Sequence, residues 1–394
     1  MIKGYLRKDG RKGIRNVTVV VYTVECAHHV ARKIANEFES DEVQVIGFPG
    51  CYPNKYAQHM LERLCEHPNV GAVVIVSLGC EGMNKVQLSK VVSESGRPVK
   101  TVTIQENGGT TSSIESGVQW IRSNNEKGYI GIVKMDVSEL IIGTICGGSD
   151  GTSGLTGNPA VGKSFDRLVK DGAICIFEET GELIGCEQNL FDRALTTEIG
   201  KELVDSITKA KTYYEVLGYP SFAPGNADGG LSTIEEKSMG AYAKSGSSPI
   251  SGLIKPGDIP EKSGLYLLDV VPDGDVRFGF PNISDTAEIV EMIACGAHMN
   301  LFCTGRGSVV GSAISPVIKI CANPQAYKNL SEDMDINAGK ILELKADVDQ
   351  IGDEIYDLVI AVAQGQKTKS ESLGHVEFIL TYKSFEPIGP SCLA

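Results

Sequence analysis

The stretch NVTVVVYTVECAHHVARKIANEF (Asn16–Phe38) contains the pattern that decides the fold. Its first part is a run of β-branched apolar residues, which is typical of a strand buried on both faces. Val30, Ile34 and Phe38 then recur at helical spacing, so a helix is expected directly after the strand. Similar apolar runs follow at 42–51, 70–80 and 99–111, and the first of them precedes a helical pattern from 55 to 67.

Strands and helices alternate along the rest of the chain as well. Further buried strands are expected in SELIIGTIC (138–146), GAICIFEET (172–180), GLYLLDVV (264–271) and HMNLFCTGRG (298–307). Continuous apolar strands that alternate with helices indicate parallel sheets covered on both faces, and hence an α/β protein. A chain of 394 residues is long enough for two domains, and the polar stretch RSNNEKGYIG (122–131) is the expected boundary.

Composition argues for a small-molecule partner. The chain has 37 Lys and Arg against 50 Asp and Glu, a formal charge of −13, which disfavours nucleic acid and anionic membranes as main partners. No stretch approaches the roughly 18 unbroken apolar residues of a membrane span. The start, MIKGYLRKDGRKGIRN, has no apolar segment of a secretory signal, so we expect a cytoplasmic protein.

The cysteines are the first candidates for chemistry. There are eleven and no CxxC pair, which removes the basic signal of zinc ribbons and thioredoxin-like motifs. Four of them stand at the carboxyl ends of expected strands, where parallel sheets bind ligands, and could converge on a metal ion or an iron–sulfur cluster. The alternative is that they are small buried hydrophobic residues. The four are Cys26, Cys51, Cys80 and Cys146.

GNPAVGKS (Gly157–Ser164) matches the Walker A pattern and offers a different reading, a nucleotide-binding module. A phosphate-binding loop must directly follow a buried strand, whereas a long polar loop, GGSDGTSGLT, precedes this motif. We therefore keep nucleotide binding as the alternative of another class, beside a non-catalytic scaffold.

Other residues suit a carboxylate substrate. Arg306 lies among glycines directly after an expected strand, and Lys319 lies between apolar neighbours, so both could bind a carboxylate; the alternatives are a surface arginine and a snorkelling lysine. Candidate proton carriers are His59, His298 and Lys237. Further substrate contacts are expected from Asn107, Gly108, Gly109, Thr110, Ser149 and Asp150, which lie in turn-forming stretches.

Several ordered motifs together resemble the altronate dehydratase/galactarate dehydratase family over nearly the whole chain. They are GYLRKDGRKGIRN, HPNVGAVVIVSLGCE, CGGSDGTSGLTGNPAVG, GGLSTIEEKS, TGRGS, PVIK and DINAG. The resemblance implies an iron-dependent lyase that removes water from a sugar acid to give a 2-keto-3-deoxy acid. It also implies a smaller dimerisation-type α/β domain (1–130), a Rossmann-like catalytic domain with a crossover (131–394), and iron, as Fe²⁺ or an Fe–S cluster, on the four cysteines.

Two departures concern substrate and partner. The chain has FGFPNIS (278–284) where altronate-type members carry a segment like MDTPGY, so the substrate could differ. A sibling branch, the large (beta) subunit of (2R)-sulfolactate sulfo-lyase, releases sulfite and pyruvate instead. The resemblance does not include the small β-clip (SAF) domain of many members. This suggests a large subunit with a small SAF-domain partner, in a homodimer or a hetero-oligomer.

Overall fold

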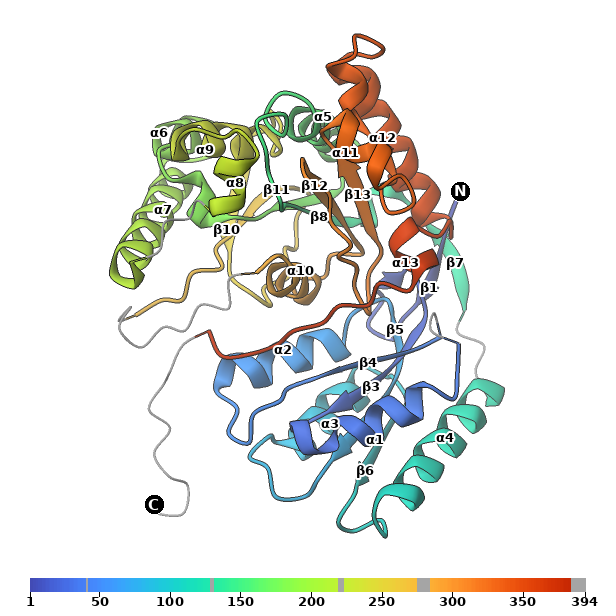
Figure 1. The fold of residues 1–394 in the computed structure, drawn as a ribbon. Helices are drawn as coiled ribbons and strands as arrows, with labels where there is room; N and C mark the ends of the chain where they lie inside the picture. The colour runs from blue at the N-terminus through green and yellow to red at the C-terminus, as the bar shows by residue number, and fades with distance from the viewer. Residues whose placement is uncertain (40–41, 128–130, 219–222, 275–283, 384–394) are drawn as a thin grey trace.

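The computed structural model describes residues 1–39, 42–127, 131–218, 223–274 and 284–383 and shows an α/β protein with two parallel sheets (Figure 1). Within these residues the first sheet has four strands in the order β4-β3-β5-β6. The strand expected at the start of Asn16–Phe38 is confirmed as β3, and the helix after it as α1. The elements of this part are β3 (Val17–Tyr22), α1 (Glu25–Ala35), β4 (Val43–Gly47), α2 (Lys55–Cys65), β5 (Val70–Ser77), α3 (Lys85–Glu94), β6 (Val99–Thr103) and α4 (Thr110–Lys127).

Helices cover both faces of this sheet, as the continuous apolar strands predict. All residues of β5 are buried, because side chains on either side of it meet a helix layer. One face packs with α1 and α4 and the other with α2 and α3. Asn54 begins α2 by accepting a hydrogen bond from the backbone N–H of Ala57, which satisfies a free donor of the first turn.

The second sheet has, in the described residues, seven parallel strands in the order β10-β11-β9-β8-β12-β13-β14. Its strands are β8 (Ile141–Cys146), β9 (Ile174–Phe177), β10 (Ile250–Ile254), β11 (Gly264–Leu268), β12 (Met299–Thr304), β13 (Val317–Cys321) and β14 (Ile336–Asn337). Its helices are α5 (Gly157–Lys170), α6 (Glu187–Arg193), α7 (Thr197–Leu217), α8 (Pro224–Asp228), α9 (Ile234–Ala243), α10 (Asp285–Ala294), α11 (Pro324–Asn329), α12 (Val348–Ala363) and α13 (Lys369–Leu373).

These helices also lie on two sides of their sheet. Helices α5, α7 and α12 pack on the face that carries Ile142 and Leu301, and α10 packs on the face that carries Ile145 and Phe302. Figure 1 shows α10 between this sheet and α2. A single apolar core therefore runs from the second sheet through α10 to the first.

A small antiparallel sheet was not expected from the sequence. Strand β1 (Ile2–Leu6) pairs with β2 (Lys12–Gly13) on one side and with β7 (Ile132–Met135) on the other. Its alternation is short, so the pattern is weak in the sequence alone. Because this sheet joins residues from both sides of position 130, the domain division at that position remains a prediction.

Two expectations about local structure are wrong. Arg122–Lys127 is the end of α4 and not a linker, since apolar Val118 and Ile121 hold this helix on the sheet. Cys26 does not end a strand: β3 stops at Tyr22, and Cys26 lies in the first turn of α1.

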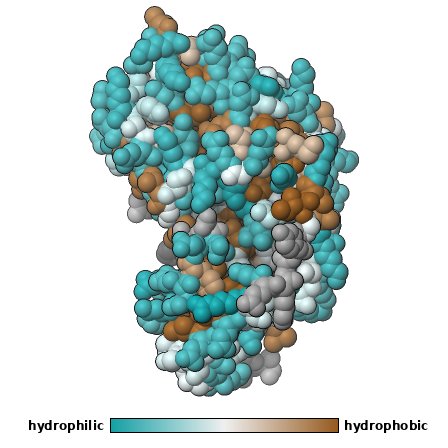
Figure 2. All heavy atoms as spheres, turned by 90° about the vertical axis from the view of Figure 1, so that its right-hand side faces the viewer, coloured by the Kyte–Doolittle hydropathy of each residue, from teal (hydrophilic) through white to brown (hydrophobic). Residues whose placement is uncertain are grey.

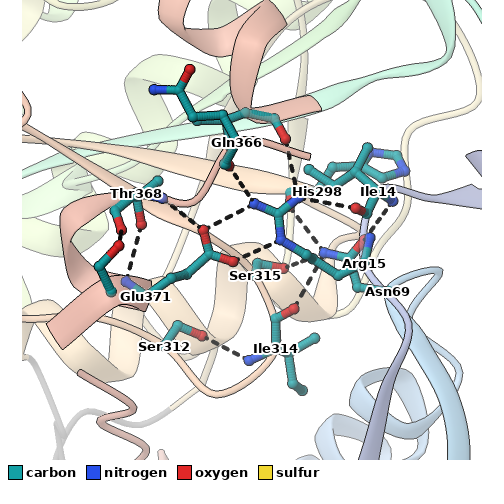
Figure 3. A network of polar contacts seen from close by, with 12 residues as sticks. Ile14, Arg15, Asn69, His298, Ser312, Ile314, Ser315, Gln366, Thr368 and Glu371 are labelled. Carbon is teal, nitrogen blue, oxygen red and sulfur yellow. Dashed lines mark hydrogen bonds and ion pairs between the residues drawn. The ribbon is translucent and has the colours of Figure 1, made fainter. Parts of the chain in front are cut away.

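Arg15 fastens the two parts of the chain together (Figure 3). Its Nε and Nη2 atoms donate to the Glu371 carboxylate at 2.7 and 2.9 Å, and its guanidinium also reaches the carbonyls of Val362 and Gln366. Asn69 makes a second link between the two parts. Its side-chain amide accepts a hydrogen bond from the N–H of Ile14 and donates one to the carbonyl of His298 at 3.0 Å. These contacts fix the orientation of one part relative to the other.

The described residues after α13 make a further contact between the two parts of the chain. In Figure 1 this red segment runs along α2. The Tyr382 ring packs edge-on against Phe48, and its hydroxyl donates to the carbonyl of Tyr52. Polar side chains cover most of the face in Figure 2, with apolar patches among them. Across the described residues, no helix has the length and apolar character that crossing a membrane requires.

Candidate active site

Strand β8 is the point in the second sheet from which later strands are added first on one side and then on the other. Strand β9 lies on one side of β8, and β12 lies on the other. In sheets of this kind ligands bind at such a switch point, beyond the carboxyl ends of the strands. Cys146 is the last residue of β8, as predicted, and it pairs in register with Cys303 of β12. The strand order therefore places Cys146 where a ligand is expected.

Two carboxylates of the segment after β9 converge on the Cys146 thiol. The donor atoms of Cys146, Glu179 and Glu182 all lie within 4.8 Å of one another, and no other such group of three His, Cys, Asp or Glu residues occurs in the described residues. The Cys146 thiol lies 3.0 Å from Oε2 of Glu179 and 3.6 Å from Oε2 of Glu182. We call these three residues the triad.

Glu179 adopts a backbone conformation that is rare for a residue with a side chain. Its φ angle is 96°, in the left-handed region, which costs about 1 to 3 kcal/mol and persists only where other contacts hold it. Those contacts are a hydrogen bond of 2.6 Å from the N–H of Cys146 to Oε1 of Glu179, and an ion pair with Lys244. The strain aims the Glu179 carboxylate at the Cys146 thiol.

Two buried lysines, one in α9 and one directly after it, neutralise the triad. Lys244 is fully buried, forms an ion pair with Glu179, and places Nζ 3.5 Å from the Cys146 sulfur. Lys237 is also buried and forms an ion pair with Glu182. Burial opposes the charge on Lys237, yet Glu182 and Cys146 raise its pKa above the usual value. Burial also raises the pKa of the Cys146 thiol, while Lys244 opposes that rise.

A hollow of about 410 Å³ opens beside Asp285. It is lined by Ser284, Asp285, Thr286, Ser308, Val309, Val310 and Glu377. Asp285 also faces Gly147, where a Cβ atom would come within 2.0 Å of its Oδ2, so only glycine fits between Cys146 and this carboxylate. Burial raises the pKa of Asp285 to about 6, and the charge of Glu182 adds to the rise. Asp285 thus lies between the hollow and the residue that follows Cys146.

Three predicted substrate contacts lie in the loops next to Cys146. A hydrogen bond from the Ser149 hydroxyl favours the Cys146 thiolate. The Asp150 carboxylate is used locally, because it accepts from the Asn323 amide at 2.9 Å and from the following turn. Arg306 is exposed, and its Nη1 donates to the carbonyl of Gly225 at 2.7 Å.

Lys319, the other residue predicted to bind a carboxylate, lies beside His375. It is fully buried in β13, and its Nζ lies 3.1 Å from Nδ1 of His375. Burial lowers its pKa, while Asp333 and Asp335 oppose the change. Its role as a carboxylate contact stays a prediction.

The two predicted histidines lie away from the triad. Nδ1 of His298 accepts from the N–H of Ile141, and its Nε2 donates to the carbonyl of Lys12, so backbone groups occupy both nitrogens. Burial lowers the pKa of His298 to about 4. His59 lies in α2 against Gly257, and burial lowers its pKa as well. Of the three predicted proton carriers, only Lys237 lies beside the triad.

The remaining predicted residues belong to the first sheet. Cys26, Cys51 and Cys80 are exposed, and no group of three donor residues within 4.8 Å includes any of them in the described part of the chain. Gly82 joins the loops of Cys51 and Cys80 through a 2.7 Å hydrogen bond to the Cys51 carbonyl. Asn107, Gly108 and Gly109 form the turn before α4, in which both glycines have positive φ, and Thr110 is the first residue of that helix.

The Walker-like segment is a helix and not a phosphate-binding loop. Gly157–Ser164 forms the first two turns of α5, because its apolar residues Ala160 and Val161 pack into the core. Its amides therefore point along the helix and cannot wrap a phosphate. Lys163 pairs with Asp349 at 3.0 Å on the surface.

Two family models together match almost the whole chain. D-galactarate/Altronate dehydratase, C-terminal, matches residues 137–385, and D-galactarate dehydratase/Altronate hydrolase, second domain, matches residues 4–127. This chain belongs to the D-galactarate/altronate dehydratase family. The resemblance inferred from its motifs is therefore confirmed.

Curated members of this dehydratase family are similar to the chain over most of its length. Altronate dehydratase of Bacillus subtilis is 31% identical over 94% of this chain and 75% of its own length. The (2R)-sulfolactate sulfo-lyase subunit beta of Chromohalobacter salexigens is 29% identical over 96% of both chains. Galactarate dehydratase (L-threo-forming) of Escherichia coli is 29% identical over 93% of this chain and 73% of its own. These relatives are lyases, and this family member is an enzyme of the same class.

Sequence reasoning missed three residues of the site in this dehydratase-family chain: Glu179, Glu182 and Lys244. A signal for the first was available, since Glu178 and Glu179 follow the buried run Ile174–Phe177 and thus stand at a strand end like Cys146. Glutamates at a strand end are thus as informative as cysteines. Lys244 could not be found this way, because only the fold carries the end of α9 to β8.

Proposed function

We propose that this protein is a metal-dependent lyase that removes the proton α to a carboxylate and expels a group from the β carbon of a small hydroxy acid. The observation that carries the proposal is the triad, with its thiol and two carboxylates inside 4.8 Å and two buried lysines beside it. The named relatives catalyse eliminations of this type on altronate, galactarate or sulfolactate, as their names state.

The triad fits a single divalent ion. One sulfur and two carboxylate oxygens form a mixed donor set that accepts Fe²⁺ among other transition metals, and three protein ligands leave positions for a substrate. An iron–sulfur cluster would need more thiols, and the described residues offer Cys146 without Cys26, Cys51 or Cys80 in its group. This supports Fe²⁺ over a cluster. When bound, the ion would supply Lewis-acid polarisation of the substrate's hydroxyl and carboxylate oxygens.

The two lysines pair with the carboxylates that would bind the ion. In the ion pairs, Lys237 neutralises Glu182 and Lys244 neutralises Glu179. With those carboxylates bound to an ion, Lys244 would face the carboxylate of the hydroxy acid, and its positive charge would stabilise the enediolate that develops as the α proton leaves. Lys237 would lose the pairing with Glu182 that raises its pKa, and would then release its proton to give a neutral amine.

Lys237 is our candidate for the proton carrier. It is the member of the predicted set that lies beside the triad, and α9 holds it so that Nζ reaches Glu182. The α proton passes to the neutral amine of Lys237, the electron pair of the C–H bond forms the double bond, and the β substituent leaves with its bonding pair. The resulting enol tautomerises to a 2-keto acid.

Water is our first candidate leaving group, which makes the product of a sugar acid a 2-keto-3-deoxy acid. The similarity to altronate and galactarate dehydratases favours it. Sulfite is the second candidate, with pyruvate as the other product, because the sulfo-lyase subunit is similar over 96% of both chains. The segment FGFPNIS (278–284), expected to bear on this choice, lies outside the described residues except for Ser284, which begins α10.

The name of that relative also bears on assembly. It is a beta subunit, which supports a proposal that this chain works with a small partner subunit of the SAF type in a hetero-oligomer. Cytoplasmic location and a homodimer stay predictions.

A substrate panel tests the proposed function. Protein purified without oxygen and loaded with Fe²⁺ is assayed on aldonates, aldarates and sulfolactate, alone and with a candidate small subunit. We expect formation of a 2-keto acid from one class, and its loss on chelation. Turnover that persists after complete removal of metal would overturn the metal-dependent mechanism.

A further inference from the structure

Four further buried or half-buried carboxylates lie near the two carboxylates of the triad, and only three of these six have a lysine of their own. Glu182 pairs with Lys237 and Glu179 with Lys244, and Lys383 pairs with Glu291 at 3.1 Å. The other three carboxylates have no ion pair within the part of the chain that the structure describes. They are Glu178, Asp285 and Glu288, and we call them the second carboxylate group.

Glu178 is the strongest sign that something is bound here. It follows β9 directly, it is fully buried, and neither of its carboxylate oxygens has a hydrogen-bond partner in the described residues. An ionised carboxylate in such a place costs several kcal/mol unless a cation or a proton compensates it. Lys244 and Lys383 lie near, yet each is committed to another glutamate.

Helix α10 presents the other two carboxylates to Glu178. Asp285 and Glu288 are three residues apart and so lie on one face of the helix, which packs against β8. In β9, Ile176 packs on the side of α10 and Phe177 on the opposite side, so the alternation of the strand points Glu178 toward α10. Burial raises the pKa of Glu288 well above its usual value, and the charges of Glu178 and Asp285 add to the rise. The three carboxylates therefore lie on one side of the sheet, and no lysine pairs with them in the described residues.

We propose that the second carboxylate group binds a second divalent cation next to the triad. All its donors are carboxylate oxygens, which suit Mg²⁺, Mn²⁺ or Ca²⁺, whereas the sulfur of Cys146 makes the triad the softer site. Of the three carboxylates, Asp285 lines the hollow described above and so is open to solvent. The inference rests on the proposed function in one respect, that the first ion occupies the triad.

We expect the second ion to bind with lower affinity than the first. Within the described residues, only the triad has three donor residues inside 4.8 Å, so the second carboxylate group must rotate its side chains inward around an ion. Binding is then expected in two steps. A proton shared within the group is the competing arrangement, and it requires no metal.

A manganese titration tests the proposal. Metal-free full-length protein is titrated with Mn²⁺, and bound ions are counted by calorimetry and by electron paramagnetic resonance. We expect two Mn²⁺ per chain with different affinities, and a spectrum broadened by coupling between them. Glu178→Gln, which keeps the shape of the side chain, should bind one Mn²⁺ with a first dissociation constant within about threefold of wild type. Glu288→Gln serves as a second variant if Glu178→Gln does not fold.

Two variants separate this inference from the proposed function. Glu291→Gln removes a neighbouring carboxylate that has its own lysine, and it should still bind two ions. Cys146→Ser should lose the tight ion. A wild type that binds one Mn²⁺, lost in Cys146→Ser but not in Glu178→Gln, overturns the second site and leaves the proposed function standing. No tight ion in the wild type overturns the metal-dependent mechanism itself.

Discussion

The Sγ atom of Cys146 lies 3.0 Å from Oε2 of Glu179, although 33 residues separate them in the chain. They meet because β8 and β9 are parallel neighbours, so the loops after both strands begin at the same edge of the sheet. Lys244 then reaches the same point from the end of α9. A thiol, a carboxylate and an ammonium are thus held together in a site with little water.

Replacing the triad thiol should abolish catalysis without unfolding the protein. Cys146→Ser keeps the side-chain size but removes the sulfur ligand, so we expect kcat to fall by at least about 100-fold together with iron content. Cys303→Ala is the matched control, since Cys303 is equally buried on the adjacent strand. The ligand assignment fails if the control loses iron and Cys146→Ser retains it.

Removing the proposed proton carrier should affect the chemical step. Lys237→Met keeps the length of the buried chain, and we expect kcat to fall by about 100-fold or more because proton transfer is lost. Iron binding should be retained, which atomic absorption can check. A change in KM alone would assign Lys237 to substrate binding and not to proton transfer.

The Walker-like motif should be dispensable. Lys163→Ala removes an exposed ion pair with Asp349, so the free energy of unfolding should change by less than about 0.5 kcal/mol. The enzymatic activity should not change. Calorimetry with ATP and GTP should show no binding to either protein. Nucleotide binding that disappears in Lys163→Ala would contradict the helical reading of Gly157–Ser164.

Breaking the junction between the two parts should cost stability. Arg15→Met removes a two-pronged contact with Glu371 and contacts with two carbonyls, and we expect the free energy of unfolding to fall by about 2 to 3 kcal/mol. Denaturant titration measures it. Arg122→Met, which removes an exposed pair with Glu37, should leave the free energy within about 0.5 kcal/mol.

His298 should make the protein less stable in mild acid. Its pKa is about 4 in the folded protein and about 6.5 in the unfolded chain, so below pH 6.5 the unfolded chain binds the proton more readily. Its contribution is complete above pH 6.5 and is lost as the pH falls toward 4, by about 1.4 kcal/mol per pH unit. His67 acts in the same direction. His298→Gln should reduce the slope by one proton, while the exposed His29→Gln should not.

The strand and helix pattern was predictable because each buried strand carries its own apolar run, as in Val17–Tyr22 and Val70–Ser77. Cys146 could also be found, since it directly follows such a run. Glu182 and Lys244 could not, because nothing local distinguishes a glutamate or lysine that the fold will bury from one on the surface. Cys26 was predicted at a strand end but lies elsewhere. The strand ends at Tyr22, before its apolar run does, and Cys26 lies in the helix that follows.

The central claim is that one sulfur and two carboxylates hold the catalytic ion. X-ray absorption at the iron edge, on protein loaded without oxygen, tests it most directly. We predict one sulfur neighbour, the remainder oxygen or nitrogen, and no second iron nearby, with the sulfur signal absent in Cys146→Ser. Three or more sulfur neighbours with an iron–iron signal would contradict the account and favour a cluster on the cysteines of the first sheet.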